Sequence, residues 1–478
     1  MTAVDRGGGY NARVARARTA FVCSECGTQH ARWVGRCSGC GSWESLVEEV
    51  LGGAPGGEAA GGRELLGGGA AARGKALPLH AIEAAAAPRF ATGLAELDRV
   101  LGGGLVPGSV VLMGGEPGVG KSTLALQLAA RVQAQGSQVL YVTGEESVEQ
   151  LRLRAGRLDR VPGELLVLAE TRVEALAEPW REARPELVVI DSVQTLHSDR
   201  VESAPGSVAQ VRESAALLAN TAKGSGTALV LIGHVTKEGV LAGPRVLEHL
   251  VDAVLTLEGD RSHAYRILRA GKNRFGSTRE VGVFTMGERG LAGVENPSEL
   301  FLSERRAAAP GSCITALVEG TRPLLIEIQA LVAPAGYGTA RRTCIGIDDG
   351  RVALMLAVLD RASSVELVSR DVYVNVTGGV RVAEPAADLA LALALASSRL
   401  DVPLPADVVA CGEVGLGGEV RRIGRLDLRV REAARLGFGR ILAPGGGGDA
   451  PPGAQVIPVE DVASAVTWLR RASRDTHA

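Results

Sequence analysis

Residues 115–123 read Gly115-Glu116-Pro117-Gly118-Val119-Gly120-Lys121-Ser122-Thr123; they follow the apolar run 110–113 and lead into the helical pattern 124–135. A strand, a glycine-rich loop and a helix in this order predict a P-loop for a nucleoside triphosphate. The glycines let backbone N–H groups turn inward around the phosphates, Lys121 reaches the β- and γ-phosphates, and the Ser122 hydroxyl is placed to ligate Mg²⁺. A purely structural glycine turn would need neither the Lys-Ser pair nor both flanking elements. We therefore expect ATP and Mg²⁺ as cofactors.

A second, acidic element supports the nucleotide site. The run 187–190 has the apolar character of a buried parallel strand, and Asp191 ends it, as expected of a Walker B residue that orients Mg²⁺ through water. Such runs alternate with helical stretches between residues 90 and 288; they are 110–113, 139–142, 165–168, 187–190, 228–232 and 253–257. The alternation predicts an α/β fold, in which a mostly parallel, twisted sheet is covered by helices on both faces and the nucleotide lies at the carboxyl ends of the strands.

The seven cysteines divide into two groups. Cys23, Cys26, Cys37 and Cys40 form two Cys-x₂-Cys pairs near the N-terminus, which is the spacing of a four-thiolate site for Zn²⁺. A pair of disulfides is the alternative, and a reducing cytosol disfavours it. Because the four thiolates fill the metal's positions, we expect a structural zinc and interpret His30 as a bystander. The remaining thiols are predicted to be buried, and they are Cys313, Cys344 and Cys411.

Length and composition limit the other possibilities. With 478 residues the chain is too long for one core and suggests about three domains. The net charge of -2 argues against a polybasic protein that coats nucleic acid. No apolar stretch reaches the length of a membrane span, and the N-terminus has no apolar leader segment, so we expect a cytoplasmic protein. The Ala/Leu run 386–396 is too short for a span and indicates a buried helix.

The predicted domain limits follow changes in composition and motif. They are a disordered tail at 1–20, a C4 zinc finger at 21–46, a flexible Gly/Ala-rich linker at 47–89, a P-loop ATPase domain at 90–290, a linker at 291–310, a second α/β unit at 311–470 and a tail at 471–478. The second unit begins with strand-like runs, 316–332 and 372–376, and then becomes helical.

Further motifs carry a resemblance to a known family. The P-loop core resembles that of the RecA-type ATPases in three segments, Thr92-Gly93-Leu94, Leu101-Gly102-Gly103-Gly104 and Tyr141-Val142-Thr143-Gly144-Glu145-Glu146-Ser147. Together with Lys272-Asn273-Arg274-Phe275-Gly276, the four-cysteine module and a Lon-like C-terminal segment, the order resembles the bacterial RadA (Sms) DNA repair and recombination family from about residue 21 to 469. The resemblance implies a DNA-dependent ATPase that forms a homo-oligomer, a hexameric ring, and promotes branch migration. Its implied partners are single-stranded and branched DNA and the RecA recombinase.

The resemblance also implies roles for individual residues. In RecA-type ATPases a glutamate after the second core strand polarises the attacking water; Glu145 matches that position better, and Glu146 is the reserve. Either Glu146 or Ser147 could instead cap the next helix. Lys272 and Arg274 belong to the family's signature motif and are expected either to reach the phosphates of a neighbouring subunit or to contact DNA.

The loops that follow Asp191 and the strand 228–232 correspond to the channel loops of RecA-like rings. Lys237 and Arg245 in the second loop are the candidate contacts to DNA phosphates. No aromatic residue lies near them in the sequence, so we expect DNA binding there to be independent of base sequence. His234 in the same loop is interpreted as a γ-phosphate sensor or a core histidine.

The C-terminal unit resembles the Lon protease domain in residues 378–388 and 412–420. Lon-type peptidases use a serine activated by a lysine, and this chain has Ala386 and Asp427 at the matching positions, which predicts an inactive protease. Glu44 replaces a family asparagine in the zinc module, which affects a partner contact rather than metal binding. Nearby arginines could bind DNA phosphates or be ordinary solvated side chains, and they are Arg421, Arg422, Arg425, Arg429 and Arg431. Two alternatives stay open: an ATP-dependent Ser/Lys peptidase and a KaiC-like signalling ATPase without a DNA substrate.

Overall fold

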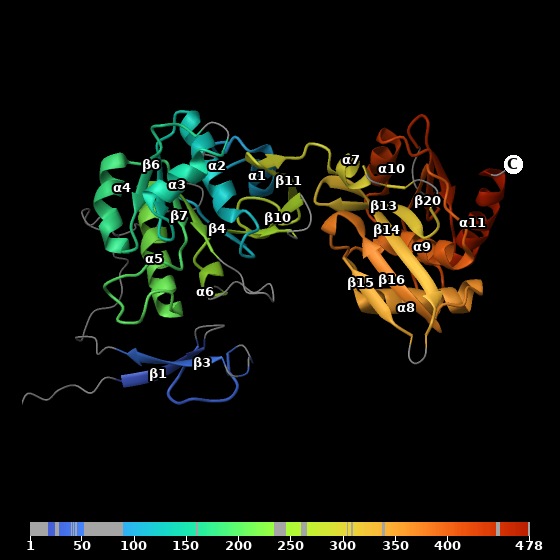
Figure 1. Cartoon of the computed structure of the whole chain (residues 1–478), viewed down its shortest axis with the longest axis horizontal. Coiled ribbons are helices and arrows are strands. Elements are labelled where there is room, and N and C mark those ends of the chain that lie inside the picture. Colours follow the sequence, from blue (N-terminus) through green and yellow to red (C-terminus); the bar gives the residue numbers. More distant parts are fainter. Residues whose placement is uncertain are drawn as a thin grey trace, which may run out of the picture.

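A computed structural model describes residues 18–23, 28–39, 41, 43, 45–51, 89–158, 161–233, 245–259, 265–303, 305–306, 309–336, 340–445 and 450–476. Two α/β units lie side by side, and a small β-module lies apart from them (Figure 1). Several residues singled out from the sequence lie outside the described residues, and they are Cys26, Cys40, Glu44, His234 and Lys237. Residues 1–17 of the predicted tail and residues 52–88 of the predicted linker also lie outside the described residues.

The first α/β unit is built on a nine-stranded sheet of order β12-β11-β10-β9-β4-β8-β7-β5-β6. Its strands from β6 to β9 are parallel, and β10 to β12 continue the sheet antiparallel. The strand bounds are β4 Val110–Gly115, β5 Val139–Thr143, β6 Leu166–Ala169, β7 Leu187–Asp191, β8 Ala228–Ile232, β9 Ala253–Glu258, β10 Tyr265–Asn273, β11 Val281–Gly287 and β12 Gly290–Gly293. The six predicted runs are thus confirmed as strands, whereas β10 to β12 were not predicted.

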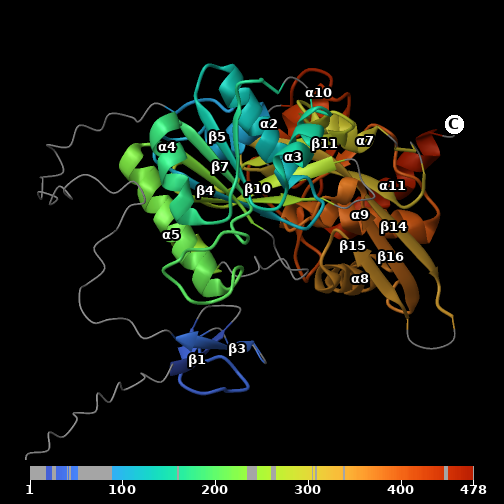
Figure 2. The ribbon, with the colours of Figure 1, turned by 60° about the vertical axis from the view of Figure 1, so that its left-hand side comes forward.

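Two apolar cores lie on the two faces of this sheet. Alternate residues of β4 point to opposite sides, so Val111 and Met113 pack with α1, α2 and α3, whereas Val110 and Leu112 pack with α4 and α5. Burial on both faces explains the continuous apolar runs of the sequence. Figure 2 shows α2 and α3 on one side of the sheet and α4 and α5 on the other. The helices of this unit are α1 Ala95–Leu101, α2 Lys121–Ala134, α3 Val148–Ala155, η2 Val173–Leu176, α4 Ala177–Ala183, α5 Val208–Ser225 and α6 Arg245–Glu248.

The second unit holds a seven-stranded mixed sheet of order β15-β16-β14-β13-β17-β20-β21, together with a small two-stranded sheet, β18-β19. The strands are β13 Ser312–Glu319, β14 Arg322–Pro334, β15 Arg342–Ile345, β16 Arg370–Val376, β17 Val408–Ala410, β18 Glu413–Val414, β19 Val420–Arg421, β20 Arg440–Ala443 and β21 Gln455–Pro458. The helices are α7 Pro297–Leu302, α8 Asp349–Ser363, η3 Thr377–Gly379, η4 Pro385–Ala387, α9 Asp388–Leu400, α10 Leu426–Arg435 and α11 Val462–Thr476.

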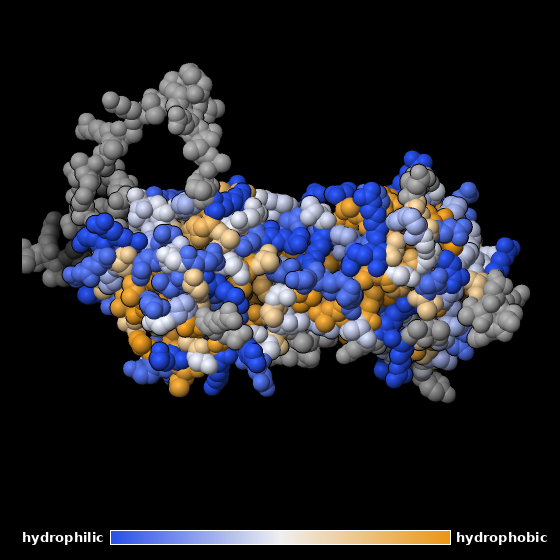
Figure 3. All heavy atoms as spheres, turned by 90° about the horizontal axis from the view of Figure 1, so that it is seen from above, coloured by the Kyte–Doolittle hydropathy of each residue, from blue (hydrophilic) through white to orange (hydrophobic). Residues whose placement is uncertain are grey.

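Helix α9 is the central element of the second core. The buried helix predicted at 386–396 is confirmed, because α9 is buried from Asp388 to Ser397 and packs among β13, β14, α8 and α11. Asp388 carries a charge into this core, where the guanidinium of Arg351 pairs with it, Nη2 to Oδ2 at 2.7 Å. None of the described helices combines the length and apolar character needed to cross a membrane. In the space-filling view from above, hydrophilic side chains cover much of both units and apolar ones gather in patches (Figure 3).

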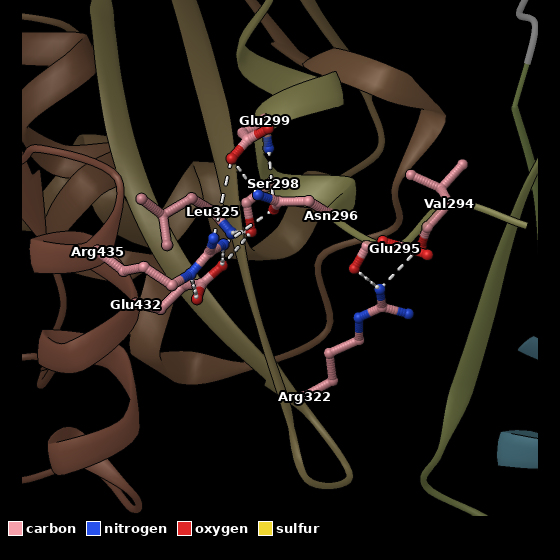
Figure 4. Close-up of polar contacts among 9 residues, drawn as sticks. All are labelled: Val294, Glu295, Asn296, Ser298, Glu299, Arg322, Leu325, Glu432 and Arg435. Carbon is pink, nitrogen blue, oxygen red and sulfur yellow. Dashed lines mark hydrogen bonds and ion pairs between the residues drawn. The ribbon is translucent and has the colours of Figure 1, made fainter. Parts of the chain in front are cut away.

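The two α/β units are joined by an ordered connection. Residues 291–310, expected from sequence to be a linker, contain most of β12 and helix α7. The Ser298 hydroxyl on α7 donates to Glu432 Oε1 at 2.8 Å and accepts the Leu325 N–H at 3.1 Å (Figure 4). The sequence predicted only a linker here, and in the structure the hydrogen-bond partners of Ser298 come from α10 and β14, far away in sequence.

The N-terminal module is a three-stranded antiparallel sheet. Its strands are β1 Arg18–Cys23, β2 Gln29–His30 and β3 Leu46–Leu51, in the order β2-β1-β3. Cys23 and Cys37 are buried together with Leu46, so the two halves of the cysteine pattern share one small core.

Candidate functional site

The P-loop connects the carboxyl end of β4 to the first turn of α2. Gly118 and Gly120 have φ of 80° and 115°, a region that side chains with a Cβ rarely adopt. A Cβ added to Gly120 would lie 2.5 Å from Met286 Cε, so that flexible side chain would have to move in addition to the backbone strain. Gly120 is the N-cap of α2, and the helix dipole and free N–H groups at that end favour an anion. The loop therefore has the form of a phosphate cradle.

Lys121 lies inside this cradle. Its ammonium donates to the carbonyl oxygens of Gly115 at 2.8 Å and Glu116 at 3.0 Å, and the residue is buried. Burial lowers the pKa of Lys121 below its ordinary value, while the charges of Asp191 and Glu145 oppose that shift. A buried ammonium held by neutral carbonyls, beside a helix N-terminus, fits the β- and γ-phosphates of a nucleotide.

Asp191 faces the P-loop from the end of β7. The Ser122 hydroxyl donates to Asp191 Oδ1 at 3.1 Å, and the Tyr141 hydroxyl donates to Oδ2 at 2.7 Å. Burial raises the pKa of Tyr141 well above its ordinary value, and the Asp191 charge and hydrogen bond raise it further. A hydroxyl and a carboxylate at this spacing are oxygen donors that fit a hydrated Mg²⁺ ion. The structure thus brings together Lys121, Ser122 and Asp191 as the sequence predicted.

The adjacent glutamates point to different partners. Glu145 accepts a hydrogen bond from the Ser192 hydroxyl, next to Asp191, and lies close enough to Lys121 to influence its pKa. Glu146 is paired with the guanidinium of Arg154. Neither glutamate caps α3, because Ser147 does so: its hydroxyl accepts the N–H of residue 150 at 3.3 Å in a capping box. Glu145 is therefore the carboxylate on the P-loop side.

Lys272 and Arg274 lie at the opposite end of the sheet from the P-loop. β10 runs antiparallel to β9, and Asn273 is paired with Ala253 at the beginning of β9. The Lys272 ammonium donates to the carbonyl oxygens of Glu248 and Val251, and Arg274 Nη1 lies 3.0 Å from Asp252 Oδ1. The length of the six-residue strand β4, about 17 Å at roughly 3.3 Å per residue, separates this motif from the P-loop of the same subunit. Neither cation can therefore serve that P-loop.

The two candidate DNA contacts in the loop after β8 are only partly described. Lys237 lies outside the described residues. Arg245 is the first residue of α6, and only its backbone is described. The backbone end of α6 is held by Lys272 through the Glu248 carbonyl at 2.5 Å. The signature motif is therefore connected to the helix that follows residues 234–244.

The Lon-like positions hold no Ser-Lys pair. Ala386 is buried in η4, and its carbonyl accepts the Gly412 N–H at 2.8 Å, whereas Asp427 is exposed on the first turn of α10. The prediction that all five arginines of the basic run bind DNA phosphates or are solvated is wrong for Arg429. It is buried, forms an ion pair with Glu384 and donates to the Ala316 carbonyl, so it cannot meet DNA. The sequence does not distinguish Arg429 from its neighbours, and the other four arginines, 421, 422, 425 and 431, are exposed.

Two of the predicted zinc ligands are described. The Cys23 thiol contacts the Ser45 hydroxyl at 3.2 Å, and Cys37 Sγ lies 3.7 Å from His30 Nε2. Cys26 and Cys40 are not described, and within the described ranges no three metal-binding side chains form a group. Of the thiols predicted to be buried, Cys313 and Cys411 are, but Cys344 is half-buried.

Several site residues were not found from the sequence. Tyr141, Arg154 and Ser192 surround Asp191 and the two glutamates, yet no motif marks them as a group. The one available signal was a tyrosine in an otherwise aliphatic buried run, since a buried hydroxyl needs a polar partner. Asp252, which holds Arg274 and the Val110 N–H, gave no signal.

A P-loop after β4, an acidic strand end at β7 and a parallel sheet define an ATPase of the RecA-like class. Residues 78–240 match the family described as an AAA domain, and residues 21–48 match the rubredoxin metal binding domain. A DNA repair protein RadA from Halalkalibacterium halodurans is 49% identical over 95% of this chain and 99% of its own length. A RadA protein from Escherichia coli is 47% identical over 94% and 98%. The chain belongs to the RadA family of DNA repair proteins.

Among solved structures, a KaiC-like protein from Pyrococcus horikoshii matches 44% of this chain and 99% of its own length, with 21% identity and a TM-score of 0.36.

Proposed function

We propose that this protein is a DNA-dependent ATPase of recombinational DNA repair, acting in the cytoplasm as a ring that moves on DNA and promotes branch migration. The observation that carries the proposal is the convergence of Lys121, Ser122, Asp191 and Glu145 at the carboxyl ends of β4, β5 and β7. Membership of the RadA family supplies the context of DNA repair.

The reaction is ATP hydrolysis, and each residue has a part in it. Lys121 leaves the loop carbonyls and neutralises charge on the β- and γ-phosphates, while the N–H groups at the start of α2 hold the phosphate oxygens. Bound Mg²⁺ would supply positive charge to those oxygens, held by Ser122 and, through water, by Asp191. Glu145 lies where a carboxylate can orient the attacking water, and Glu146 stays paired with Arg154.

The remote position of Lys272 and Arg274 supports a role outside their own subunit. An ATPase site at a subunit interface needs cations from a neighbour, and these two residues lie about a strand length from their own P-loop. We propose that the subunits assemble as a hexamer in which the motif meets either the neighbour's nucleotide or DNA. Lys237 and Arg245 are proposed to contact DNA phosphates, and RecA recombinase is proposed as a partner.

The two other units have proposed roles as well. Cys23, Cys26, Cys37 and Cys40 would hold a structural Zn²⁺, which the match to a metal binding domain supports. The C-terminal unit is proposed to be an inactive protease fold used for assembly, because a methyl group stands at Ala386 where a nucleophile is needed. The peptidase alternative is disfavoured for the same reason.

The central test is ATP turnover with and without single-stranded DNA over a range of salt. We expect DNA to stimulate turnover and the stimulation to weaken as salt rises, because phosphate contacts release counterions. Lys121→Ala should abolish turnover, whereas the matched control Lys223→Ala, on the exposed side of α5, should not. Turnover in Lys121→Ala would refute the ATPase site, and absence of DNA stimulation would favour the KaiC-like alternative.

A mixing experiment tests action between subunits. Chains with Lys272→Ala and chains with Lys121→Ala should regain partial turnover when mixed, since some interfaces then hold both intact lysines. Absence of rescue, with normal turnover of Lys272→Ala alone, would assign the motif to DNA.

A further inference from the structure

The two oxygens of the Asp191 carboxylate have different surroundings. Oδ1 faces the P-loop and accepts the Ser122 hydroxyl at 3.1 Å. Oδ2 faces away from the loop, where it accepts the Tyr141 hydroxyl at 2.7 Å and lies 3.9 Å from Arg154 Nη1. Ser122 comes from α2, Tyr141 from β5 and Arg154 from α3, so three elements meet at one side chain.

Such an arrangement limits how the carboxylate can rotate. The terminal torsion of an aspartate is broad and does not by itself fix which oxygen points in which direction. A donor on Oδ2 holds that oxygen in place, and the other oxygen is then directed at the P-loop. Thr143 of β5 is paired with Asp191 of β7, and Tyr141 lies two residues before Thr143 on the same strand. Alternate residues of a strand point to the same face, so the Tyr141 side chain lies beside Asp191 on the neighbouring strand.

We propose that Tyr141 and Arg154 are positioning residues that fix the Asp191 carboxylate, so that Oδ1 is presented to the Mg²⁺–nucleotide complex. The inference rests on the proposed ATPase function. Tyr141 has no exposed surface, and its ring packs in the apolar core between α2 and the sheet. A phenylalanine ring would fill that core equally well, so packing alone does not require the hydroxyl. A buried hydroxyl without a hydrogen-bond partner is unfavourable, and the partner of this one is Asp191.

Arg154 links the same oxygen to the glutamate pair. One guanidinium nitrogen, Nη2, pairs with Glu146, and the other, Nη1, approaches Asp191 Oδ2. Arg154 Nη1 makes no hydrogen bond within the described residues, so its influence on Asp191 Oδ2 from the side of α3 is that of a nearby positive charge, and the pairing through Nη2 keeps Glu146 away from the position that Glu145 holds. The adjacent glutamates are thereby separated in role, one paired with Arg154 and one facing the P-loop.

The test measures Mg²⁺-dependent binding of a fluorescent, non-hydrolysable ATP analogue to the full chain. For Tyr141→Phe and Arg154→Gln we expect about a 10-fold rise in the Mg²⁺ concentration that gives half-maximal binding, the usual loss when an outer partner of a metal site is removed. Turnover should fall at limiting Mg²⁺ and recover with excess Mg²⁺, with the KM for ATP little changed. The matched control Tyr373→Phe removes a hydroxyl from the exposed side of β16 and should behave as the parent.

Asp191→Asn is the reference that separates this inference from the proposed function. If Asp191→Asn raises the Mg²⁺ requirement but Tyr141→Phe and Arg154→Gln do not, the positioning role is refuted and the ATPase site stands. If Asp191→Asn has no effect, the carboxylate has no metal role and the positioning proposal falls, whereas the ATPase assignment is decided separately by Lys121→Ala. Should Tyr141→Phe lower the melting temperature so far that binding cannot be measured, Arg154→Gln decides, because that side chain is partly exposed.

Discussion

Replacing Arg322 by alanine should destabilise the junction between the two α/β units. Arg322 at the start of β14 places Nη1 2.6 Å from Glu96 Oε2 on α1, and Nη2 donates to the carbonyl oxygens of Val294 at 2.9 Å and Glu295 at 2.7 Å. The side chains of Arg322 and Glu96 are only 9% and 6% exposed. The substitution therefore leaves a buried carboxylate with one cationic neighbour, Arg99, whose Nε lies 4.0 Å from Glu96 Oε1.

The expected magnitude follows from that burial. Breaking a buried ion pair by removing one partner costs about 3–5 kcal/mol, because the remaining charge stays desolvated. Arg435 offers a matched control in the same region (Figure 4): it pairs with Glu432 at 2.9 Å but is 49% exposed. Its partner Glu432 is 11% exposed but keeps the Ser298 hydroxyl as a hydrogen-bond donor, and water screens the half-exposed guanidinium. Arg435→Ala should therefore cost less than Arg322→Ala.

Amide hydrogen exchange at Val283 measures the loss of stability next to Glu96. The Val283 N–H donates to the same Glu96 oxygen at 2.8 Å, so its protection should fall sharply in Arg322→Ala and little in Arg435→Ala. The double variant Glu96→Gln with Arg322→Met removes both charges and keeps an acceptor for Val283, so much of the loss should be recovered. Equal protection in the two alanine variants would refute the reasoning, as would a double variant no more stable than Arg322→Ala.

Three further outcomes are expected. Glu145→Gln should bind nucleotide yet lose most turnover, whereas Glu146→Gln should keep far more; the reverse order in a turnover assay would exchange their roles. Gly120→Ala should impair nucleotide binding, because its φ of 115° strains any residue with a Cβ inside the phosphate loop, while Gly136→Ala, with φ 93° and open space away from the loop, should cost about 1–2 kcal/mol in thermal unfolding without loss of binding. Burial and the neighbouring Asp349 raise the pKa of Cys344 to about 12, so its thiolate fraction at pH 8 lies below that of an ordinary thiol; iodoacetamide labelling that is rapid at pH 8 would contradict this.

Features carried by contiguous residues could be predicted from the sequence. The P-loop is one continuous stretch, so its glycine torsions, its lysine and its helix N-terminus follow from local spacing. The parallel strands were recognisable because burial on both faces demands an unbroken apolar run. The antiparallel strands β10 to β12 escaped prediction because β10 lacks the two-residue period of a strand, its charged residues Arg266, Arg269 and Lys272 recurring at every third position, and because β12 contains two glycines in Gly290–Gly293.

Only the tertiary structure decided which polar side chains meet. Five arginines between residues 421 and 431 look alike in sequence, yet Arg429 alone among them is buried, because its position on α10 faces Glu384 and β13. Lys272 and Arg274 lie far from their own P-loop because β10 runs antiparallel to β9, a direction that no local pattern indicates. The two oxygens of Asp191 have different hydrogen-bond partners, and this difference likewise depends on β5 and β7 being neighbours in the sheet. Local spacing sets the backbone of a motif, whereas partners distant in the chain are chosen by sheet order and strand direction.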